Sequence, residues 1–252
     1  MTQIEKAARF AELHRPGNPI TLYNAWDAGS AKAIAAAGAP VIATSSWAVA
    51  AAHGYGDGEA LPLDFLERIA ARIIASTDLP VTVDFEGGYS EDDGEVAGNL
   101  ARLIEAGAIG INFEDRIVQG HGLHAIDRQA ARIAALRAAA DAAGVPLFIN
   151  ARTDLFLGQG NEPADVVDEA VERAKAYAAA GASGLFIPGL IDEGLIARIV
   201  EGSPLPVNVM MMGGAPSIAQ LAAIGVARVS FGNMPYSDAM AALTQAAAAK
   251  IG

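Results

Sequence analysis

The sequence predicts a closed (β/α)8 barrel, and three observations support this prediction. First, an alanine-rich helical segment, a glycine and a short apolar strand recur in that order along the chain. Parallel neighbouring strands need a crossover, and a helix is the usual one. Second, eight such units within 252 residues match the size of this barrel. Third, no predicted helix opens with the glycine-rich dinucleotide fingerprint that would favour the alternative, an open doubly wound sheet.

The predicted strands are short apolar runs rich in β-branched residues, which favour extended structure. The first, PITLYN, is followed by PVIAT and by the run that ends in VTVD. In chain order the eight strands are predicted over residues 19–24, 40–44, 80–84, 108–113, 145–151, 183–187, 206–210 and 226–231.

The predicted helices fill the intervals between the strands. Glycines such as Gly38, Gly107 and Gly144 end them, because glycine readily adopts the left-handed conformation of a helix C-terminus. An N-terminal helix ends at Pro16 and Gly17. No stretch has the composition of a linker, so residues 1–252 are predicted to form a single barrel domain. The remaining helices are predicted over residues 28–37, 63–76, 95–106, 127–143, 162–180, 192–201, 217–224 and 236–250.

The composition excludes several classes of function. A formal net charge of -12 repels nucleic-acid backbones and anionic membranes, so neither is an expected partner. The absence of cysteine excludes disulfides, thiolate metal sites and a cysteine nucleophile. The N-terminal segment lacks the apolar core of a signal peptide, and no apolar run approaches the roughly 20 residues of a membrane span. These features predict a soluble, cytoplasmic protein.

The segment from Val81 to Tyr89, VTVDFEGGY, carries the first chemical signal. It predicts a buried strand that ends in Asp84 and Glu86 before two glycines release the chain into a loop. Buried carboxylates are costly unless a basic side chain or a hard divalent cation neutralises them. Mg²⁺ is the natural cation here, with Mn²⁺ as the alternative, because it binds carboxylate, water and substrate oxygens. A solvated loop that caps the next helix is the non-functional interpretation.

More polar residues follow the other predicted strands, mostly the second to the fifth. In a (β/α)8 barrel these C-terminal strand ends form the active-site rim. Three carboxylates are expected to share one cation there: Asp84, Glu86 and Glu114. Arg152 is expected to hold a substrate carboxylate in a bidentate fork. The alternative is that Arg152 neutralises Asp84 or Glu114 without a metal.

With these residues placed, the chain resembles the isocitrate lyase and phosphoenolpyruvate mutase superfamily over most of its length. VDFEGGY is similar to the family's metal motif, which implies Asp84 as the direct Mg²⁺ ligand, although Glu86 stands where an aspartate is usual. NFEDR carries Glu114 at the family position that supports the metal from outside its direct ligands. NARTD places Arg152 where the family arginine holds the 2-oxo acid.

The segment SSWAVAAAHGYGD resembles the family's substrate-carboxylate turn followed by its gating loop. This resemblance implies that Ser45, Ser46 and Trp47 bind the substrate carboxylate and that Asp57 lies at the gate. It extends more loosely to Asn208, a further candidate for substrate binding. It also implies a homotetramer, a dimer of dimers in which the last helix packs on a neighbouring barrel.

The chain departs from the family's isocitrate and methylisocitrate lyases at two places. Their loop after the fourth strand carries a lysine, arginine, cysteine, glycine, histidine run, whereas this loop reads RIVQGHGLHAID. Their glutamate at the end of the sixth strand is replaced by Gly189. Both differences argue against cleavage of isocitrate or methylisocitrate by that mechanism. The loop also lacks the asparagine and serine pair expected of phosphonate mutases.

His121 and His124 in this loop are candidates to replace the missing acid, because imidazole titrates near neutral pH. Solvated surface residues are the alternative. The remaining core predicts a magnesium-dependent lyase, oxaloacetate-type decarboxylase or hydrolase. It would cleave a C–C or C–P bond next to a 2-oxo acid through an enolpyruvate-like intermediate, acting on a small 2-oxo acid or dicarboxylate. A phosphoenolpyruvate/phosphonopyruvate mutase and a non-catalytic 2-oxo acid binding protein are the alternatives.

Overall fold

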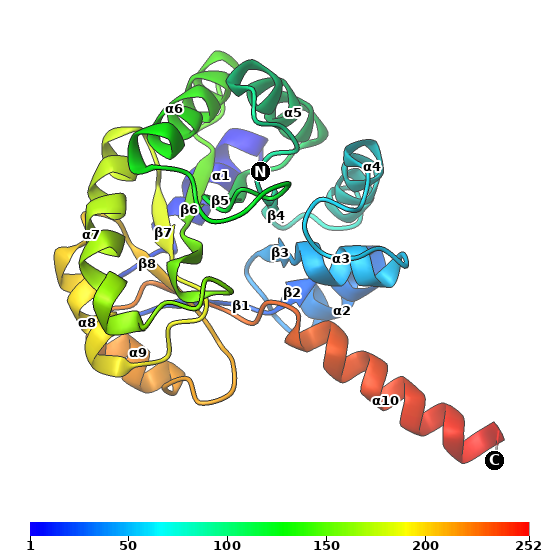
Figure 1. The fold of residues 1–252 in the computed structure, drawn as a ribbon. Coiled ribbons are helices and arrows are strands. Elements are labelled where there is room, and N and C mark those ends of the chain that lie inside the picture. The colour runs from blue at the N-terminus through cyan, green and yellow to red at the C-terminus, as the bar shows by residue number, and fades with distance from the viewer. Residues whose placement is uncertain (252) are drawn as a thin grey trace.

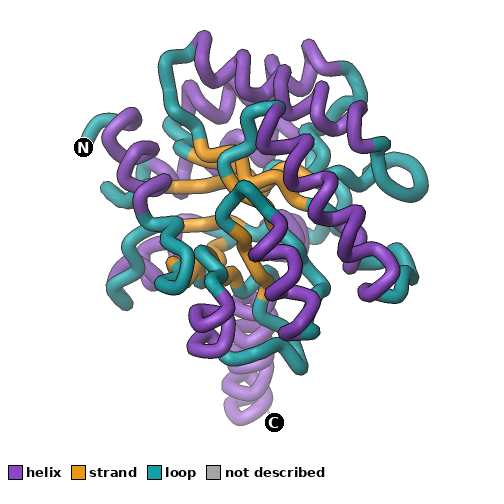
Figure 2. Tube along the Cα trace, turned by 90° about the vertical axis from the view of Figure 1, so that its left-hand side faces the viewer, coloured by secondary structure: helices purple, strands orange, loops and turns teal. Residues whose placement is uncertain are grey.

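Parallel strands ringed by helices form a barrel in the computed structural model, which describes residues 1–251 (Figure 1). The strands follow one another around the sheet in the order β1-β9-β8-β7-β6-β5-β4-β3-β2. Figure 2 shows them at the centre of the surrounding helices. Their bounds are β1 (Ile20–Leu22), β2 (Asn24–Ala25), β3 (Ile42–Thr44), β4 (Val81–Asp84), β5 (Gly110–Glu114), β6 (Phe148–Arg152), β7 (Gly184–Phe186), β8 (Val207–Met210) and β9 (Arg228–Ser230).

One strand closes the barrel. β1 pairs with β9 and β2 pairs with β3, and only Tyr23 separates the two segments. They are therefore two halves of the first predicted strand, and the nine segments occupy eight barrel positions. All eight predicted strands are confirmed, although most are one to three residues shorter than predicted. Several predicted strands contained a proline near their start, which has no N–H to donate to a strand ladder.

The helices lie where the sequence predicts them, with one addition. Their bounds are α1 (Gln3–Glu12), α2 (Ala28–Ala36), α3 (Ser46–Ala52), α4 (Leu63–Ile74), α5 (Asp93–Ala106), α6 (Ile126–Ala142), α7 (Pro163–Ala179), α8 (Glu193–Gly202), α9 (Ile218–Ile224) and α10 (Met234–Ile251), and a 3₁₀ turn, η1, covers Asp154–Phe156.

The additional helix is α3, in a segment expected to be a turn and the start of a loop. Ser45 caps it, because its Oγ accepts a 3.4 Å hydrogen bond from the N–H of Ala48. Its alanines are the strongest helix formers, which explains why a helix forms here. The loop that carries Asp57 therefore begins only after Ala52.

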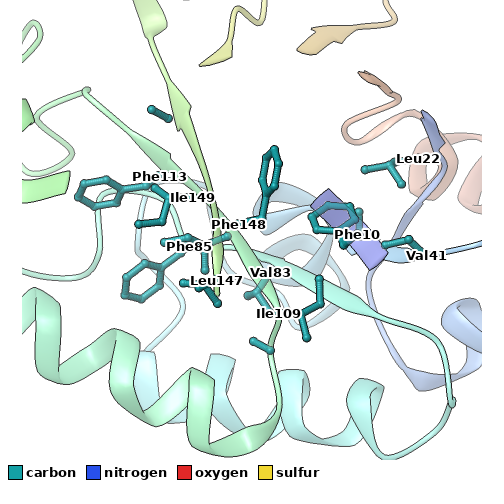
Figure 3. Packing of buried hydrophobic residues seen from close by; sticks show 14 of the residues in the cluster. Phe10, Leu22, Val41, Val83, Phe85, Ile109, Phe113, Leu147, Phe148 and Ile149 are labelled. Atoms are coloured by element: carbon teal, nitrogen blue, oxygen red, sulfur yellow. The ribbon is translucent and has the colours of Figure 1, made fainter. Parts of the chain in front are cut away.

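The N-terminal helix closes the end of the barrel opposite the active-site rim. Phe10 of α1 lies edge-on to Phe148 at the start of β6, with ring centroids 5.2 Å apart, and it contacts Gly110 at the start of β5. The guanidinium of Arg228 at the start of β9 lies 5.8 Å from the same ring. Figure 3 shows Phe10 and Phe148 among the buried residues of the core. No helix among residues 1–251 combines the length and hydrophobicity of a membrane span.

Candidate active site

A cavity of about 320 Å³ opens at the C-terminal ends of the strands, where the barrel fold places active sites. It collects side chains from almost every strand. From the residues that the sequence singles out, it is lined by Ser45, Ser46, Trp47, Asp57, Asp84 and Arg152. The other five, Glu86, Glu114, His121, His124 and Asn208, are not in its lining.

Asp84 ends β4 and is nearly buried, with 8% of its surface exposed. Ser46 donates two hydrogen bonds to its Oδ2, from the backbone N–H at 2.9 Å and from Oγ at 2.8 Å. The amide of Asn112 reaches Oδ1 only at 3.5 Å. In the structure Ser46 orients Asp84, and its contact with a substrate oxygen stays a prediction. The weakly bonded Oδ1 is the oxygen that a cation or substrate can use.

Arg152 ends β6, and the strand register places it beside Glu114 of β5. Its Nη1 lies 3.0 Å from Oε2 of Glu114, so one of the two ion pairs that the sequence left open is present. Its Nε and Nη2 donate to the two oxygens of Asp154 at 2.6 and 2.9 Å. The bidentate fork predicted to hold a substrate carboxylate therefore holds Asp154. Although burial opposes the charge, Glu114 and Asp154 raise the pKa of Arg152 above its ordinary value.

Glu114 lies behind Arg152 rather than on the cavity wall, and 3% of its surface is exposed. Burial raises its pKa well above the ordinary value, while the charge of Arg152 acts in the opposite direction. Glu114 thus contributes to the field of the site and positions Arg152.

Glu86 is not among the residues that line the cavity. It lies beyond the end of β4 at Asp84, and its backbone has a φ of 50°, in the left-handed region. Its Oε2 accepts the N–H of Glu59 at 2.7 Å, and its Oε1 accepts the hydroxyl of Tyr89 at 3.2 Å. Burial, followed by the charge of Asp84, raises the pKa of Glu86 to about 7. The role of Glu86 as a metal ligand stays a prediction. In the structure its carboxylate oxygens accept hydrogen bonds from Glu59 and Tyr89.

The two loop histidines lie outside the cavity. His121 is exposed in a separate hollow that Arg116 and Gln159 also line. His124 is buried, and its Nε2 lies 3.4 Å from Glu91. Burial, followed by the charge of Arg132, lowers the pKa of His124. Neither imidazole faces the cavity in this structure, so the predicted acid role of His121 finds no contact here.

Asn208 is likewise not part of the cavity lining. It is buried within β8 and donates to Oγ of Ser230 at 3.2 Å. Its predicted contact with substrate therefore has no geometric support. Three other asparagines do line the cavity, Asn24, Asn112 and Asn233. Asn112 was predicted only as part of a strand, and the signal that could have found it was its polar side chain in the otherwise apolar run AIGINF.

The described residues, 1–251, contain no preformed cage of three or more His, Cys, Asp or Glu side chains around a metal position. The donor set nevertheless fits a cation that takes one protein carboxylate and completes its shell with water and substrate, as Mg²⁺ does. Asp84 offers a weakly bonded oxygen. Burial raises the pKa of both Asp57 and Glu86, and repulsion from the charge of Asp84, which a cation would offset, adds to the effect.

Comparison with known proteins identifies the family of the chain. The family model described as "Phosphoenolpyruvate phosphomutase" matches residues 10–251. The chain is similar to a Burkholderia cenocepacia J2315 crystal structure provisionally assigned as a phosphonomutase, with a TM-score of 0.94, 51% identity and coverage of 96% of this chain and 99% of that one.

Sequence comparison gives two further relatives that support the family assignment. An uncharacterised Mycobacterium tuberculosis protein is 36% identical over 95% of this chain and 88% of its own length. The 2-methylisocitrate lyase of Escherichia coli is 31% identical over 81% of this chain and 73% of its own length. The chain therefore belongs to the phosphoenolpyruvate mutase and isocitrate lyase superfamily, whose lyases, mutases and hydrolases act on 2-oxo acids.

Proposed function

We propose that this protein is a magnesium-dependent enzyme that cleaves a C–C or C–P bond next to a 2-oxo acid through an enolpyruvate-like intermediate. The reaction is that of a lyase, an oxaloacetate-type decarboxylase or a hydrolase, on a small 2-oxo acid or dicarboxylate. The observation that carries the proposal is that Asp84 and Arg152 line one cavity, with Oδ1 of Asp84 nearly free. Bound Mg²⁺ would be held by Asp84 and would supply a Lewis acid for the 2-oxo and carboxylate oxygens.

Arg152 supplies positive charge where the enolate develops. A guanidinium has five N–H donors. Arg152 directs one each from Nε and Nη2 to Asp154 and one from Nη1 to Glu114, so two remain for a substrate oxygen. Because Asp154 and Glu114 fix the guanidinium plane, its orientation costs little reorganisation during the reaction. In decarboxylation, the C3–carboxylate bond breaks, CO₂ leaves, and the electron pair forms the enolate.

Asp57 is the candidate for returning a proton to C3. It lies on the loop between α3 and α4 and lines the cavity mouth. Burial, followed by the charge of Asp84, raises its pKa, which favours the protonated form that an acid needs. Trp47, from the start of α3, covers the same side of the cavity and limits the access of water.

Alanine substitutions test the proposal. Asp84→Ala and Arg152→Ala are expected to abolish turnover of the substrate found by screening 2-oxo acids with Mg²⁺, while circular dichroism stays that of the wild type. Asp78→Ala is the matched control, because Asp78 is outside the cavity and precedes the opposite end of β4. Activity like that of the wild type in either site variant would overturn the proposal.

The second candidate function is the mutase reaction, which interconverts phosphoenolpyruvate and phosphonopyruvate. The match to the phosphomutase family model and the similarity to the Burkholderia protein favour it. The altered loop after β5 is the feature against it. Phosphorus NMR decides between the two: interconversion of phosphonopyruvate and phosphoenolpyruvate would replace the first candidate. Tight 2-oxo acid binding without any turnover would instead indicate a binding protein.

We also propose that the protein is a homotetramer, a dimer of dimers that exchanges α10. This helix extends away from the barrel, and within residues 234–251 only Pro235 is buried (Figure 1). A groove of about 480 Å³ lies beside the first strand, lined by Thr21, Tyr23 and α2 residues such as Ile34. A second copy's α10 has the apolar, alanine-rich character to fill it.

Sedimentation velocity tests the assembly. The full chain is expected to sediment as a tetramer, and a chain ending at Asp238 is expected to lose that assembly. A monomeric full chain at micromolar concentration would contradict the proposal.

A further inference from the structure

The cavity has two chemically different halves. Its charged side chains, Asp57, Asp84 and Arg152, come from the loop after α3 and from β4 and β6, and uncharged polar groups extend around to Ser230 of β9 and Asn233. The neighbouring strands β7 and β8, which pair with each other, contribute an apolar wall. This methionine wall consists of Phe186, Met210, Met211 and Met212, joined by Leu157 from the loop after β6. Both halves face the same space.

The methionine wall offers no group that would bind an anion. Of the described residues that line the cavity, Arg152 is the only basic one, and Glu114 and Asp154 already offset its charge. A charged substituent that remained on C3, against this wall, would therefore contact thioethers and an aromatic ring, where its desolvation is uncompensated. Methionine side chains are flexible and polarisable, so they pack well against alkyl groups of different shapes.

The backbone next to the methionine wall leaves no room for a charged side chain at the end of β7. Gly189 follows β7 with a φ of 90°, and a Cβ there would lie 2.2 Å from the carbonyl oxygen of Phe156. No side chain fits at this position, so the end of β7 adds neither an acid nor a base to the cavity. The apolar character of this half follows from the backbone as well as from the side chains.

We infer that the substrate carries an apolar substituent on C3, which remains on that carbon and packs against the methionine wall. This inference rests on the proposed function, since it takes the 2-oxo carboxylate to bind in the polar half. The 2-oxo acid released is then an alkyl homologue of pyruvate rather than pyruvate itself or an acid with a second carboxylate.

Calorimetric titration of the full-length protein with Mg²⁺ tests the inference. The probes are pyruvate, 2-oxobutanoate and 2-oxopentanoate, with 2-oxoglutarate as the charged counterpart of 2-oxopentanoate. Each added methylene is expected to lower the Kd by about fourfold, the effect of burying one methylene group. 2-Oxoglutarate is expected to bind more weakly than 2-oxopentanoate.

A charge on the wall should invert this order. Met212→Arg is expected to weaken 2-oxopentanoate binding at least about tenfold and to tighten 2-oxoglutarate binding. Ile4→Arg is the matched control, because Ile4 is 54% exposed on α1 at the other end of the barrel. The wild-type series tests the inference even where Met212→Arg fails to fold.

The outcomes separate the two proposals. Rising affinity with chain length supports the inference. Tighter binding of 2-oxoglutarate than of 2-oxopentanoate overturns it and leaves the proposed function intact. No binding of any 2-oxo acid in the presence of Mg²⁺ overturns both.

Discussion

The backbone N–H of Glu59 donates a 2.7 Å hydrogen bond to Oε2 of Glu86, and this bond ties the loop that carries Asp57 to the end of β4. Tyr89 joins the pair, since its N–H donates to Oε1 of Glu59 at 2.8 Å. These three residues are the non-glycine residues of positive φ in the described chain, with values of 58°, 50° and 62°. Such conformations persist only where neighbouring contacts impose them.

Replacing Glu86 should therefore loosen the loop. Glu86→Ala removes both acceptor oxygens, and amide hydrogen exchange at residues 57–59 is expected to rise by roughly tenfold, the equivalent of about one hydrogen bond. Mass spectrometry of exchanged peptides measures this. Glu105→Ala, an exposed acid on α5, is the control. Unchanged exchange together with a large loss of Mg²⁺ affinity would show that Glu86 acts on the metal instead.

Asp115 is the centre of a buried network next to the active site. It accepts hydrogen bonds from Arg173 at 3.0 Å, from the hydroxyl of Tyr177 at 2.9 Å and from the N–H of Asp154 at 3.0 Å. Asp115→Ala leaves Arg173 buried without this partner, which should cost about 3–5 kcal/mol of unfolding free energy. Urea denaturation measures it. Glu169→Ala removes the exposed partner of Arg173 and should cost about 1 kcal/mol or less. Equal losses would contradict this account.

His14 should make the protein less stable in acid. Its ring stacks on Phe148 with centroids 3.9 Å apart, and burial, followed by the charge of Arg228, lowers its pKa to about 3 from 6.5. Between these values the unfolded chain binds a proton that the folded chain does not, so stability falls as the pH falls. The loss due to His14 is about 2 kcal/mol between pH 7 and pH 5.

The variant His14→Gln isolates this contribution, because every other titrating group is shared with the wild type. Urea denaturation of both proteins at pH 7 and pH 5 gives the comparison. The stability of the wild type should fall by about 2 kcal/mol more than that of the variant. Parallel losses would show that His14 binds its proton in the folded state.

Gly189 should tolerate no side chain. Its φ is 90°, and the carbonyl oxygen of Phe156 lies 2.2 Å from the point that a Cβ would occupy, so Gly189→Ala must displace backbone. We expect a loss of at least about 2 kcal/mol in unfolding free energy, measured by urea denaturation. Gly213→Ala, where a Cβ meets nothing within 4 Å, is the control. Gly189→Glu should for the same reason fail to restore a lyase-type glutamate.

The sequence predicted the barrel well because its signals are local. Each strand is an apolar run of a few residues, and most helices are followed closely by a glycine, so β4 and its terminal Asp84 follow from nearby residues alone. The helix α3 was not predicted, because its alanines were assigned to a turn and loop by resemblance to the family.

The site was harder to predict because it depends on where strands stop. Alternation along a strand places residues two apart on the same face, which would put Glu86 beside Asp84. The strand ends at Asp84, however, and the positive φ of Glu86 redirects its side chain. Likewise, the sequence marked Arg152 as charged and near the rim, but not that Asp154, two residues later, occupies its fork.

The seam between β1 and β9 has a consequence for synthesis. Residues 20–22 pair with residues 228–230, so the barrel joins its two ends only when nearly the whole chain is available. A chain that emerges from its N-terminus must hold the first strand unpaired on one edge until β9 appears, and such an edge is open to wrong pairing. The last step of folding is therefore set by the end of the chain, and a truncation before residue 228 should leave an open, aggregation-prone sheet.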